Sequence, residues 1–419
     1  MPANNYLMVL PVRHFRIDPC HVAVEGAFAE HLRMMRNRIG SAADRLVMAS
    51  PSMSADAYKS KGQTLSILDE EAEGIRFCTL FTDQAQPSLG GKIRRIMPML
   101  RTIYASCRQS TVVHSGLSWD VWLPFEFTAV LLGILMRRRT VFVVDIDYRN
   151  SAIMSYRVGD WSWKSYAACR YIYDTLRSLQ LHVAAHCCSL VLLKGKKLVS
   201  DFGPGRSNVR YILDAAHSNV HIIGEASLQT KINRVRDVSS PLRLTYFGRL
   251  TAYKGIDQCL RATAMARQLG ANVLMDIIGS GEQFEALRRL SSECSADSYV
   301  RFHGGLPFDR EFFNTLYQFH LLLAAPLRED TPRSALDAMA AGVPYLAFDT
   351  YYYRELLESG AGQTVPWLDV EAMAHAIVDL HGNRERLATM MENAVAYARA
   401  NTQEIWLDRR MAWTLPRAA

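Results

Sequence analysis

The sequence lacks several features that mark well-known classes of protein. Its 8 cysteines include no Cys-x-x-Cys pair, and the adjacent Cys187 and Cys188 cannot supply the spaced ligands of a zinc knuckle. Its longest apolar run, residues 127–136, is about half as long as a membrane-spanning helix. Residues 1–5 lack the basic and apolar stretches of a signal peptide. We therefore expect a cytoplasmic protein with free thiols, no membrane span, and no bound metal or cofactor.

The chain contains more basic than acidic residues. Lysine and arginine number 48 against 41 acidic residues, which gives a net charge of +7. Such an excess indicates an anionic partner: a phosphorylated substrate, an anionic lipid surface or nucleic acid. Nucleic acid is the weakest of these, because the basic residues are not interleaved with aromatic ones. The basic segment 90–108, interrupted by Pro98, is either a solvated helix face, which we favour, or a helix resting on an anionic membrane surface.

The length of 419 residues predicts two domains. Strand and helix patterns alternate without hairpin signals, which is typical of parallel, doubly wound α/β sheets. The pattern loosens over residues 219–240, so we place the boundary there. We expect domains at 1–225 and 226–395, followed by a helical segment at 396–419. In the second half we expect strands near 242–247, 273–278, 299–303, 320–325 and 343–348.

Three places in the first half carry polar or small residues at predicted strand ends. Gly26 lies near the start of a helix predicted from about Ala23 to Ile39, where a ligand could approach the backbone. His114 lies near the end of a strand predicted at 111–116. Asp145 and Asp147 follow another strand, but no third metal ligand is near them. We therefore expect these acids to bind substrate hydroxyls or to order their loop.

Four loops of the second half follow predicted strands, and together they contain groups that can bind an anion. They supply glycines, fixed cations and a helix N-terminus, and this combination suits a diphosphate. Because the carboxyl ends of parallel strands meet at one edge of a sheet, we expect the loops to form one ligand site. The loops are Gly248–Gly255, Gly279–Gly281, His303–Gly305 and Glu329–Ser334.

The last of these loops leads into a short helix with strong boundary signals. Thr331 and Pro332 have the residue types of an N-cap and a first helical position, and Gly342 is a stop signal. Arg333 places a cation in the first turn, where it opposes the helix dipole, and this suggests an incoming anion. Two acids flank the start of the helix, Glu329 and Asp337.

Residues 242–350 resemble the nucleotide-sugar domain of the retaining GT-B glycosyltransferases of family 4. The resemblance rests on Tyr246-Phe247-Gly248-Arg249-Leu250, Ile277-Ile278-Gly279-Ser280-Gly281, Val300-Arg301-Phe302-His303-Gly304 and the two acids separated by seven residues. It implies two Rossmann-like domains that face each other across a cleft, with C-terminal helices packing back on the N-terminal domain. The first half matches only in layout, including Gly26 in a glycine-rich, acceptor-side loop.

The resemblance also implies roles for individual residues. Arg249 and Lys254 would hold the donor diphosphate, Glu329 would bind the sugar and Asp337 the ribose. Catalytic residues would be Glu329, Lys254, Arg249 and His114. Residues that bind substrate would be Gly26, Gly248, Arg249, Lys254, His303, Gly304, Leu306, Glu329, Thr331, Pro332, Arg333, Ser334 and Asp337.

Three features depart from the family pattern. Asp337 stands where the family usually has glutamate, and Thr331-Pro332 replaces a Phe-Gly pair. The Asn-Gly-Val-Asp stretch that usually precedes the second domain is missing around residues 220–225. None of these changes removes a charge from the predicted site.

The expected activity is retaining, metal-independent transfer of a sugar from a nucleoside-diphosphate sugar to a glycan or lipid-linked acceptor. The expected context is polysaccharide or glycolipid assembly in the cytoplasm, with peripheral attachment to the inner face of the membrane as one alternative. Two other functions stay open. One is a sugar-nucleotide epimerase of the same fold, and the other is a non-catalytic sugar-nucleotide-binding or assembly protein.

Overall fold

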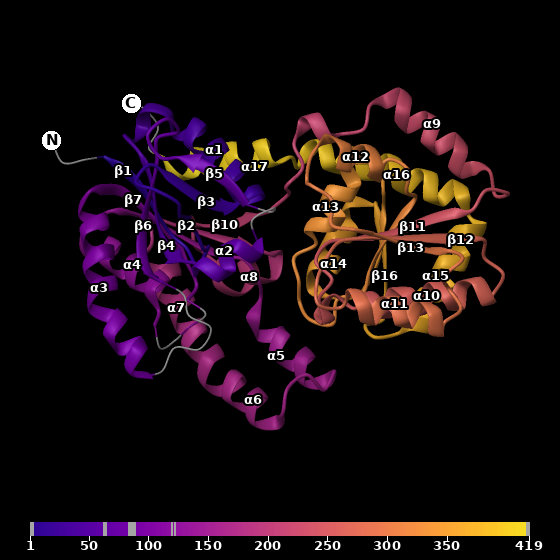
Figure 1. Cartoon of the computed structure of the whole chain (residues 1–419), viewed down its shortest axis with the longest axis horizontal. Coiled ribbons are helices and arrows are strands. Elements are labelled where there is room, and N and C mark those ends of the chain that lie inside the picture. The colour runs from indigo at the N-terminus through magenta and orange to yellow at the C-terminus, as the bar shows by residue number, and fades with distance from the viewer. Residues whose placement is uncertain (1–3, 62–64, 83–88, 119, 121–122, 416–419) are drawn as a thin grey trace. The chain divides into compact units, whose positions relative to one another are not determined.

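The computed structural model describes residues 4–61, 65–82, 89–118, 120 and 123–415, and it divides into two compact units (Figure 1). Unit 1 consists of Met1–Asp145, Ala167–Ile212 and Trp406–Ala419. Unit 2 consists of Ile146–Tyr166 and Leu213–Ile405. Each unit is built around its own parallel sheet, which confirms the predicted α/β class.

The main sheet of unit 1 has seven parallel strands among the described residues, in the order β10-β9-β8-β7-β1-β4-β6. The inner strand β1, between β7 and β4, is buried at every position, as expected for a strand covered on both faces. The strands are β1 (Asn5–Val9), β4 (Leu46–Ser52), β6 (Ile75–Thr82), β7 (Ser110–Gly116), β8 (Arg139–Val144), β9 (Leu190–Lys194) and β10 (Val209–Ile212). The helices of this unit are α1 (Gly26–Ile39), α2 (Ala55–Lys61), α3 (Leu89–Arg108), α4 (Phe125–Leu135), α7 (Asp174–Cys187), α8 (Lys196–Phe202) and, from residue 406 on, α17 (Gln403–Thr414).

Unit 1 also contains a small antiparallel sheet, which the sequence prediction missed. It consists of β2 (Phe15–Arg16), β3 (His21–Glu25) and β5 (Leu65–Asp69), in the order β2-β3-β5. The expectation of parallel pairing throughout was therefore wrong, and so was the helix start near Ala23, because β3 continues to Glu25. The turn before β3 is held by Asp18, whose carboxylate accepts hydrogen bonds from the backbone N–H groups of Cys20 and His21.

The C-terminal helix α17 packs on the core of unit 1, as predicted. Its Leu407 and Met411 are buried in one cluster with Tyr6 and Met8 of β1. This contact joins the two ends of the chain within one core.

The sheet of unit 2 has six parallel strands among the described residues, in the order β13-β12-β11-β14-β15-β16. The five strands predicted in the second half are all present, within two residues of their expected bounds. The strands are β11 (Leu242–Phe247), β12 (Val273–Ile278), β13 (Val300–Gly304), β14 (Leu321–Ala324), β15 (Tyr345–Phe348) and β16 (Gly362–Val365). The helices are α5 (Tyr148–Arg157), α6 (Trp163–Ala168, which crosses the boundary between the units), α9 (Glu225–Arg236), α10 (Ile256–Gln268), α11 (Phe284–Glu293), α12 (Arg310–Leu316), α13 (Arg333–Ala340), α14 (Tyr351–Leu356), α15 (Val370–Gly382) and α16 (Arg384–Ala400).

The compact units differ from the predicted ranges at three places. Residues 213–225 and 396–405 belong to unit 2, and so does the insertion 146–166, although it interrupts the strands of the first sheet. Hydrogen bonds explain the first difference, because the backbone of Ile223 donates to Ala340 and that of His217 donates to the Asp337 carboxylate. The predicted loose stretch 219–240 contains a complete helix, α9.

None of the helices in the described residues combines the length and the apolar character that crossing a lipid bilayer requires.

Candidate functional site

Backbone contacts hold the predicted loops of unit 2 together. The N–H of Gly248, after β11, donates to the carbonyl of Ile278 on β12. The N–H of Gly279 in turn donates to Gly304. These contacts place the ends of β11, β12 and β13 at one edge of the sheet, where parallel α/β folds bind ligands.

Glycine is required at two points where these loops pass each other. Gly255 has a φ of 62°, and a Cβ there would lie 1.9 Å from the carbonyl oxygen of Ala325. Gly279 has a φ of 152°, and its Cβ would lie 1.9 Å from the carbonyl oxygen of Gly248. A side chain at either position would separate the loops, so these glycines permit the close packing of the site.

Three cations surround the ring of Tyr253 in the loop between β11 and α10. Arg249 donates from Nη2 to the Tyr253 hydroxyl at 3.2 Å. The guanidinium carbon of Arg328 lies 4.6 Å from the ring centroid, and Lys254 Nζ lies 5.4 Å from it. Attraction of Arg328 and Lys254 to the ring offsets part of the mutual repulsion of the cations. The arrangement creates a concentrated positive charge.

Lys254 also links the two principal loops of the site. Its ammonium group pairs with the carboxylate of Asp330, and both side chains are largely buried. The backbone N–H of Leu327 donates to the carbonyl of Tyr253 at 2.8 Å, which fixes the same two loops to each other. The predicted neighbours Arg249, Lys254 and Glu329 are therefore on loops that the structure brings together.

Glu329 is a buried carboxylate with one unused oxygen. Glu329 is 4% exposed. Its Oε1 accepts hydrogen bonds from Asn150 Nδ2 at 2.6 Å and from the Tyr351 N–H at 3.2 Å. Oε2 has no hydrogen-bond partner in the described part of the chain. Burial raises the pKa of this carboxyl, although hydrogen bonds from Asn150, Tyr351 and Tyr352 oppose the rise. A buried acceptor without a donor is costly, and a ligand hydroxyl would satisfy it.

The helix after this loop begins one residue later than predicted. Pro332 occupies the N-cap position of α13 and Arg333 is its first residue, so the assignment of Thr331 as N-cap was wrong. Proline carries no side-chain acceptor, and the cap makes no side-chain hydrogen bond. The Ser334 hydroxyl instead donates to the carbonyl of Phe247, which ties the first turn of α13 to β11.

Asp337 lies in a different environment from the one expected. It is 4% exposed, and its Oδ1 accepts hydrogen bonds from the backbone N–H groups of Ala216 and His217 at 3.0 and 2.8 Å. His217 Nδ1 lies 3.4 Å from the same oxygen. The carboxylate therefore holds residues 216–217 against α13, and its ribose-binding role stays a prediction.

The His303 side chain contacts Asp276, an acid on the neighbouring strand of the same sheet. Its Nε2 lies 2.7 Å from Asp276 Oδ1, and Arg243 binds the other oxygen of that carboxylate at 3.2 Å. Gly304, the next residue, meets Gly279 as described above. Leu306 is 41% exposed in the loop that follows β13.

His114 and Gly26, the two residues predicted in the first half, lie in unit 1. His114 is 1% exposed, its Nε2 accepts from Arg410 at 2.7 Å, and its Nδ1 lies 3.2 Å from the Tyr6 hydroxyl. Burial, followed by the charge of Arg410, lowers the pKa of His114 well below its usual value. The His114 ring is therefore buried between Arg410 and Tyr6, and its contact with the sugar stays a prediction. Gly26 begins α1 directly after β3.

The two aspartates considered as a metal pair have partners of their own. Asp145 pairs with Lys194 at 2.8 Å. Asp147 caps α5 through the Arg149 N–H and forms an ion pair with the same residue. Within the described residues, no group of three His, Cys, Asp or Glu side chains could hold a metal ion.

The sequence analysis assigned no side-chain role to four residues that build the site. Three of them, Tyr253, Arg328 and Asp330, are next to predicted site residues in the sequence. This adjacency could have identified them. Asn150 is 179 residues from Glu329, and no local pattern connects the two.

Comparison with known proteins agrees with this arrangement. Residues 229–397 match the model of the family described as glycosyl transferases group 1. A segment of 151 residues is 29% identical to the GDP-mannose-dependent alpha-(1-6)-phosphatidylinositol monomannoside mannosyltransferase of Mycolicibacterium smegmatis and covers 34% of this chain and 39% of that protein. Matches to curated relatives span between about a fifth and two fifths of their length.

Several solved structures match almost the whole chain, including Anabaena Alr3699/HepE and WaaG. Anabaena Alr3699/HepE, solved in complex with UDP, has a TM-score of 0.65 at 16% identity, covering 98% of this chain and 99% of that one. WaaG, a glycosyltransferase involved in lipopolysaccharide biosynthesis, has a TM-score of 0.63 at 13% identity, covering 98% and 100%. The fold is thus that of the GT-B glycosyltransferases. Within this fold, residues 229–397 of unit 2 carry the similarity to the glycosyl transferases group 1 family.

Proposed function

We propose that the protein transfers a sugar from a nucleoside-diphosphate sugar to an acceptor hydroxyl. The observation that carries the proposal is Glu329, a buried carboxylate whose free Oε2 lies on a loop joined to a cluster of cations. A sugar hydroxyl would donate to Oε2, and the diphosphate would meet Arg249 and Lys254. HepE, the structural relative solved with UDP, supports a nucleotide ligand for this fold.

The cations would stabilise the leaving group. As the bond between the anomeric carbon and the diphosphate oxygen breaks, negative charge grows on that oxygen. Arg249, Lys254 and the N-terminus of α13 would balance this charge, and fixed donors of this kind contribute several kcal/mol to transition-state stabilisation. Asp330, which now pairs with Lys254, would share the ammonium group with the phosphate.

We propose that the reaction retains the configuration of the sugar and needs no divalent metal. The acceptor oxygen would form its new bond on the face that the diphosphate leaves, and a phosphate oxygen would take the acceptor proton. Two fixed cations and a helix N-terminus already provide the charge that a metal would supply. Transfer should therefore continue at an unchanged rate in the presence of EDTA.

The acceptor belongs to the class of glycans or lipid-linked glycans, as the names of the mannosyltransferase and WaaG relatives suggest. Helix α3 would bring the protein to an anionic membrane surface. Its Ile93 and Met97 are 59% and 58% exposed, and Arg94 and Arg101 are exposed beside them. Sedimentation with vesicles of phosphatidylglycerol but not of phosphatidylcholine would support this role, and equal recovery with both would contradict it.

Two substitutions test the activity. Lys254→Ala and Glu329→Ala should each lower turnover of the donor about a hundredfold, the scale of losing one preorganised electrostatic partner. Circular dichroism should show an intact fold. Arg261→Ala, which removes an exposed cation from α10, is the matched control and should keep the wild-type rate. Wild-type rates in both site variants would refute the assignment.

A further inference from the structure

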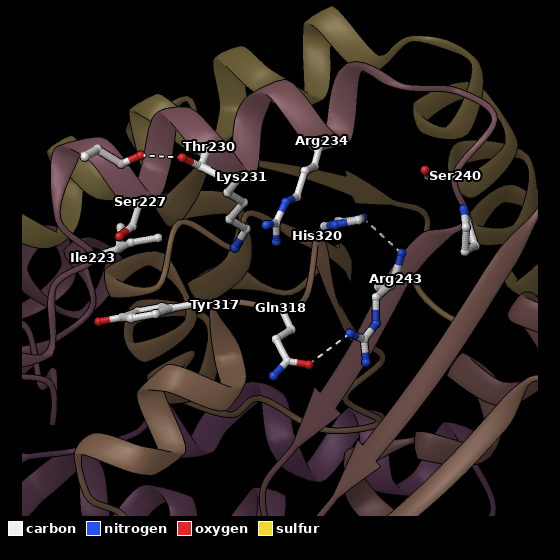
Figure 2. Close-up of a pocket in the computed structure, with 12 residues that line it drawn as sticks. Ile223, Ser227, Thr230, Lys231, Arg234, Ser240, Arg243, Tyr317, Gln318 and His320 are labelled. Carbon is white, nitrogen blue, oxygen red and sulfur yellow. Dashed lines mark hydrogen bonds between the residues drawn. The ribbon is translucent and has the colours of Figure 1, made fainter.

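A second cavity lies at the opposite edge of the sheet of unit 2 (Figure 2). It has a volume of about 720 Å³, within the range of small-molecule sites. Arg243 is the second residue of β11 and His320 immediately precedes β14, so the cavity opens at the amino ends of these strands. The loops of the candidate donor site follow the carboxyl ends of the same strands, about 20 Å away for a six-residue strand.

The charged groups of this cavity have one sign. Lys231 and Arg234 extend into it from α9, and Arg243 enters from β11 (Figure 2). Ser227 and Thr230 add hydroxyl groups from α9, and no acidic side chain is among the described residues that line the cavity. Every charged side chain that lines the cavity is thus a cation and a hydrogen-bond donor.

Lys231 is the least expected of these residues. It is 6% exposed, and its Nζ donates at 2.8 Å to the carbonyl oxygen of Ala341, at the C-terminus of α13. Within the part of the chain that the structure describes, no carboxylate forms an ion pair with it. Burial lowers the pKa of Lys231 well below its usual value. A buried ammonium group without a counterion is unfavourable, and an anion in the cavity would relieve this cost.

Two neighbours of Lys231 retain unused donors. Arg243 binds Gln318 through Nη1 and Asp276 through Nη2, but its Nε is buried without a hydrogen-bond partner in the described residues. His320 Nδ1 accepts from the Arg243 N–H at 3.1 Å, so its proton lies on Nε2, which is a donor. Burial, followed by the charges of Lys231, Arg384 and Arg243, lowers the pKa of His320 to about 3. The field in the cavity is therefore strongly positive.

We propose that this cavity binds a small phosphorylated molecule, of the size of a sugar phosphate or a nucleotide. Phosphate oxygens accept several charge-assisted hydrogen bonds at once, which matches the ammonium, guanidinium and imidazole donors here. The volume exceeds that of free phosphate and leaves room for an attached sugar or base beside Ile223 and Tyr317. Among the described residues, the cavity shares no lining residue with the loops proposed to bind the sugar donor. It can therefore be tested separately from the proposed activity.

Isothermal titration of the full chain with pyrophosphate and with glucose 6-phosphate tests this proposal. The wild type should bind at least one of the two probes. Lys231→Met and Arg234→Gln should each weaken that binding at least tenfold. Arg234 is exposed, so its variant keeps the fold even if the buried Lys231→Met variant does not. Arg236→Gln is the matched control, because Arg236 lies on the same helix but pairs with Glu385 and does not line the cavity.

Lys254→Ala separates this cavity from the candidate donor site, because it removes a proposed diphosphate contact there. Probe binding that remains in Lys254→Ala and is lost in the double variant Lys254→Ala/Arg234→Gln belongs to the cavity. Loss of binding in Lys254→Ala together with normal binding in Arg234→Gln would place the anion at the donor site and overturn the proposal. Absence of binding of both probes at millimolar concentration would overturn it too. Binding of a poly-glutamate peptide in place of both probes would assign the cavity to an acidic protein partner and would likewise contradict the proposal.

Discussion

Asn150 donates a hydrogen bond of 2.6 Å to Glu329, although the two residues are 179 positions apart in the chain. Asn150 lies on α5, within the segment 146–166 that leaves the strands of the first sheet and joins unit 2. Its amide is a side-chain donor to Glu329 Oε1, and the backbone N–H of Tyr351 donates to the same oxygen. Asn150 therefore positions the carboxylate that the proposed function assigns to the sugar.

Asn150→Ala should lower turnover between about tenfold and a hundredfold, because a hydrogen bond to a charged group contributes about 1.5–3 kcal/mol. The hydrogen bond also lowers the pKa of Glu329 against the effect of burial. Its loss should therefore move the acidic limb of the pH–rate profile to higher pH. Arg157→Gln, at the exposed end of α5, should change neither rate nor profile. A lower rate with an unshifted profile would mean that Asn150 has only a structural role.

Gly255→Ala should destabilise unit 2 by more than about 2 kcal/mol, because the left-handed backbone and the clash with the Ala325 carbonyl act together. The measurement is the midpoint of urea unfolding. Gly382→Ala is the control, since its Cβ would meet no atom within 4 Å and its φ is not in the left-handed region. A Gly255→Ala variant as stable as the control would contradict the packing of these loops.

Glu126 provides a test in unit 1. It is 3% exposed, and burial raises its pKa to about 7 although the Ser118 hydroxyl donates to it. Between the ordinary value near 4.5 and 7, the folded protein binds more protons than the unfolded chain, so its free energy of unfolding falls as the pH rises. The fall attributable to this group is about 3 kcal/mol.

Glu126→Gln removes this titration and should make unit 1 more stable than the wild type above pH 7. Thermal unfolding between pH 4.5 and 8 measures the difference. Glu285→Gln, which changes an exposed carboxylate on α11, should retain the wild-type slope. The prediction fails if the slope is the same in all three proteins.

Local signals explain why much of unit 2 was predictable. The strand Val273–Ile278 was predicted with its observed bounds, because a run of large apolar residues ends at Gly279, which a close backbone contact requires. The same logic placed Gly248 and Gly255. The antiparallel sheet of unit 1 was missed, because its turn uses Asp18 and Pro19 rather than the usual glycine pairs.

Contacts between distant segments could not be predicted from the sequence. Asp337 had the right spacing from Glu329, but its partner is the backbone of residues 216–217, which no local pattern reveals. His114 was placed correctly on its strand, yet the helix that covers it comes from the C-terminus and brings Arg410 to its ring. Spacing along the chain predicted the elements on which these residues lie. Tertiary packing determined which groups their side chains contact.

The central claim is that the loops carrying Lys254 and Glu329 bind a nucleoside-diphosphate sugar. Thermal unfolding with a panel of UDP-, GDP- and ADP-sugars tests it most directly, because a ligand at a hundred times its Kd adds about 2.7 kcal/mol of stability. We predict that one class of donor raises the Tm of the wild type and that Lys254→Ala abolishes this shift. No shift with any donor, or an equal shift in the variant, would contradict the claim.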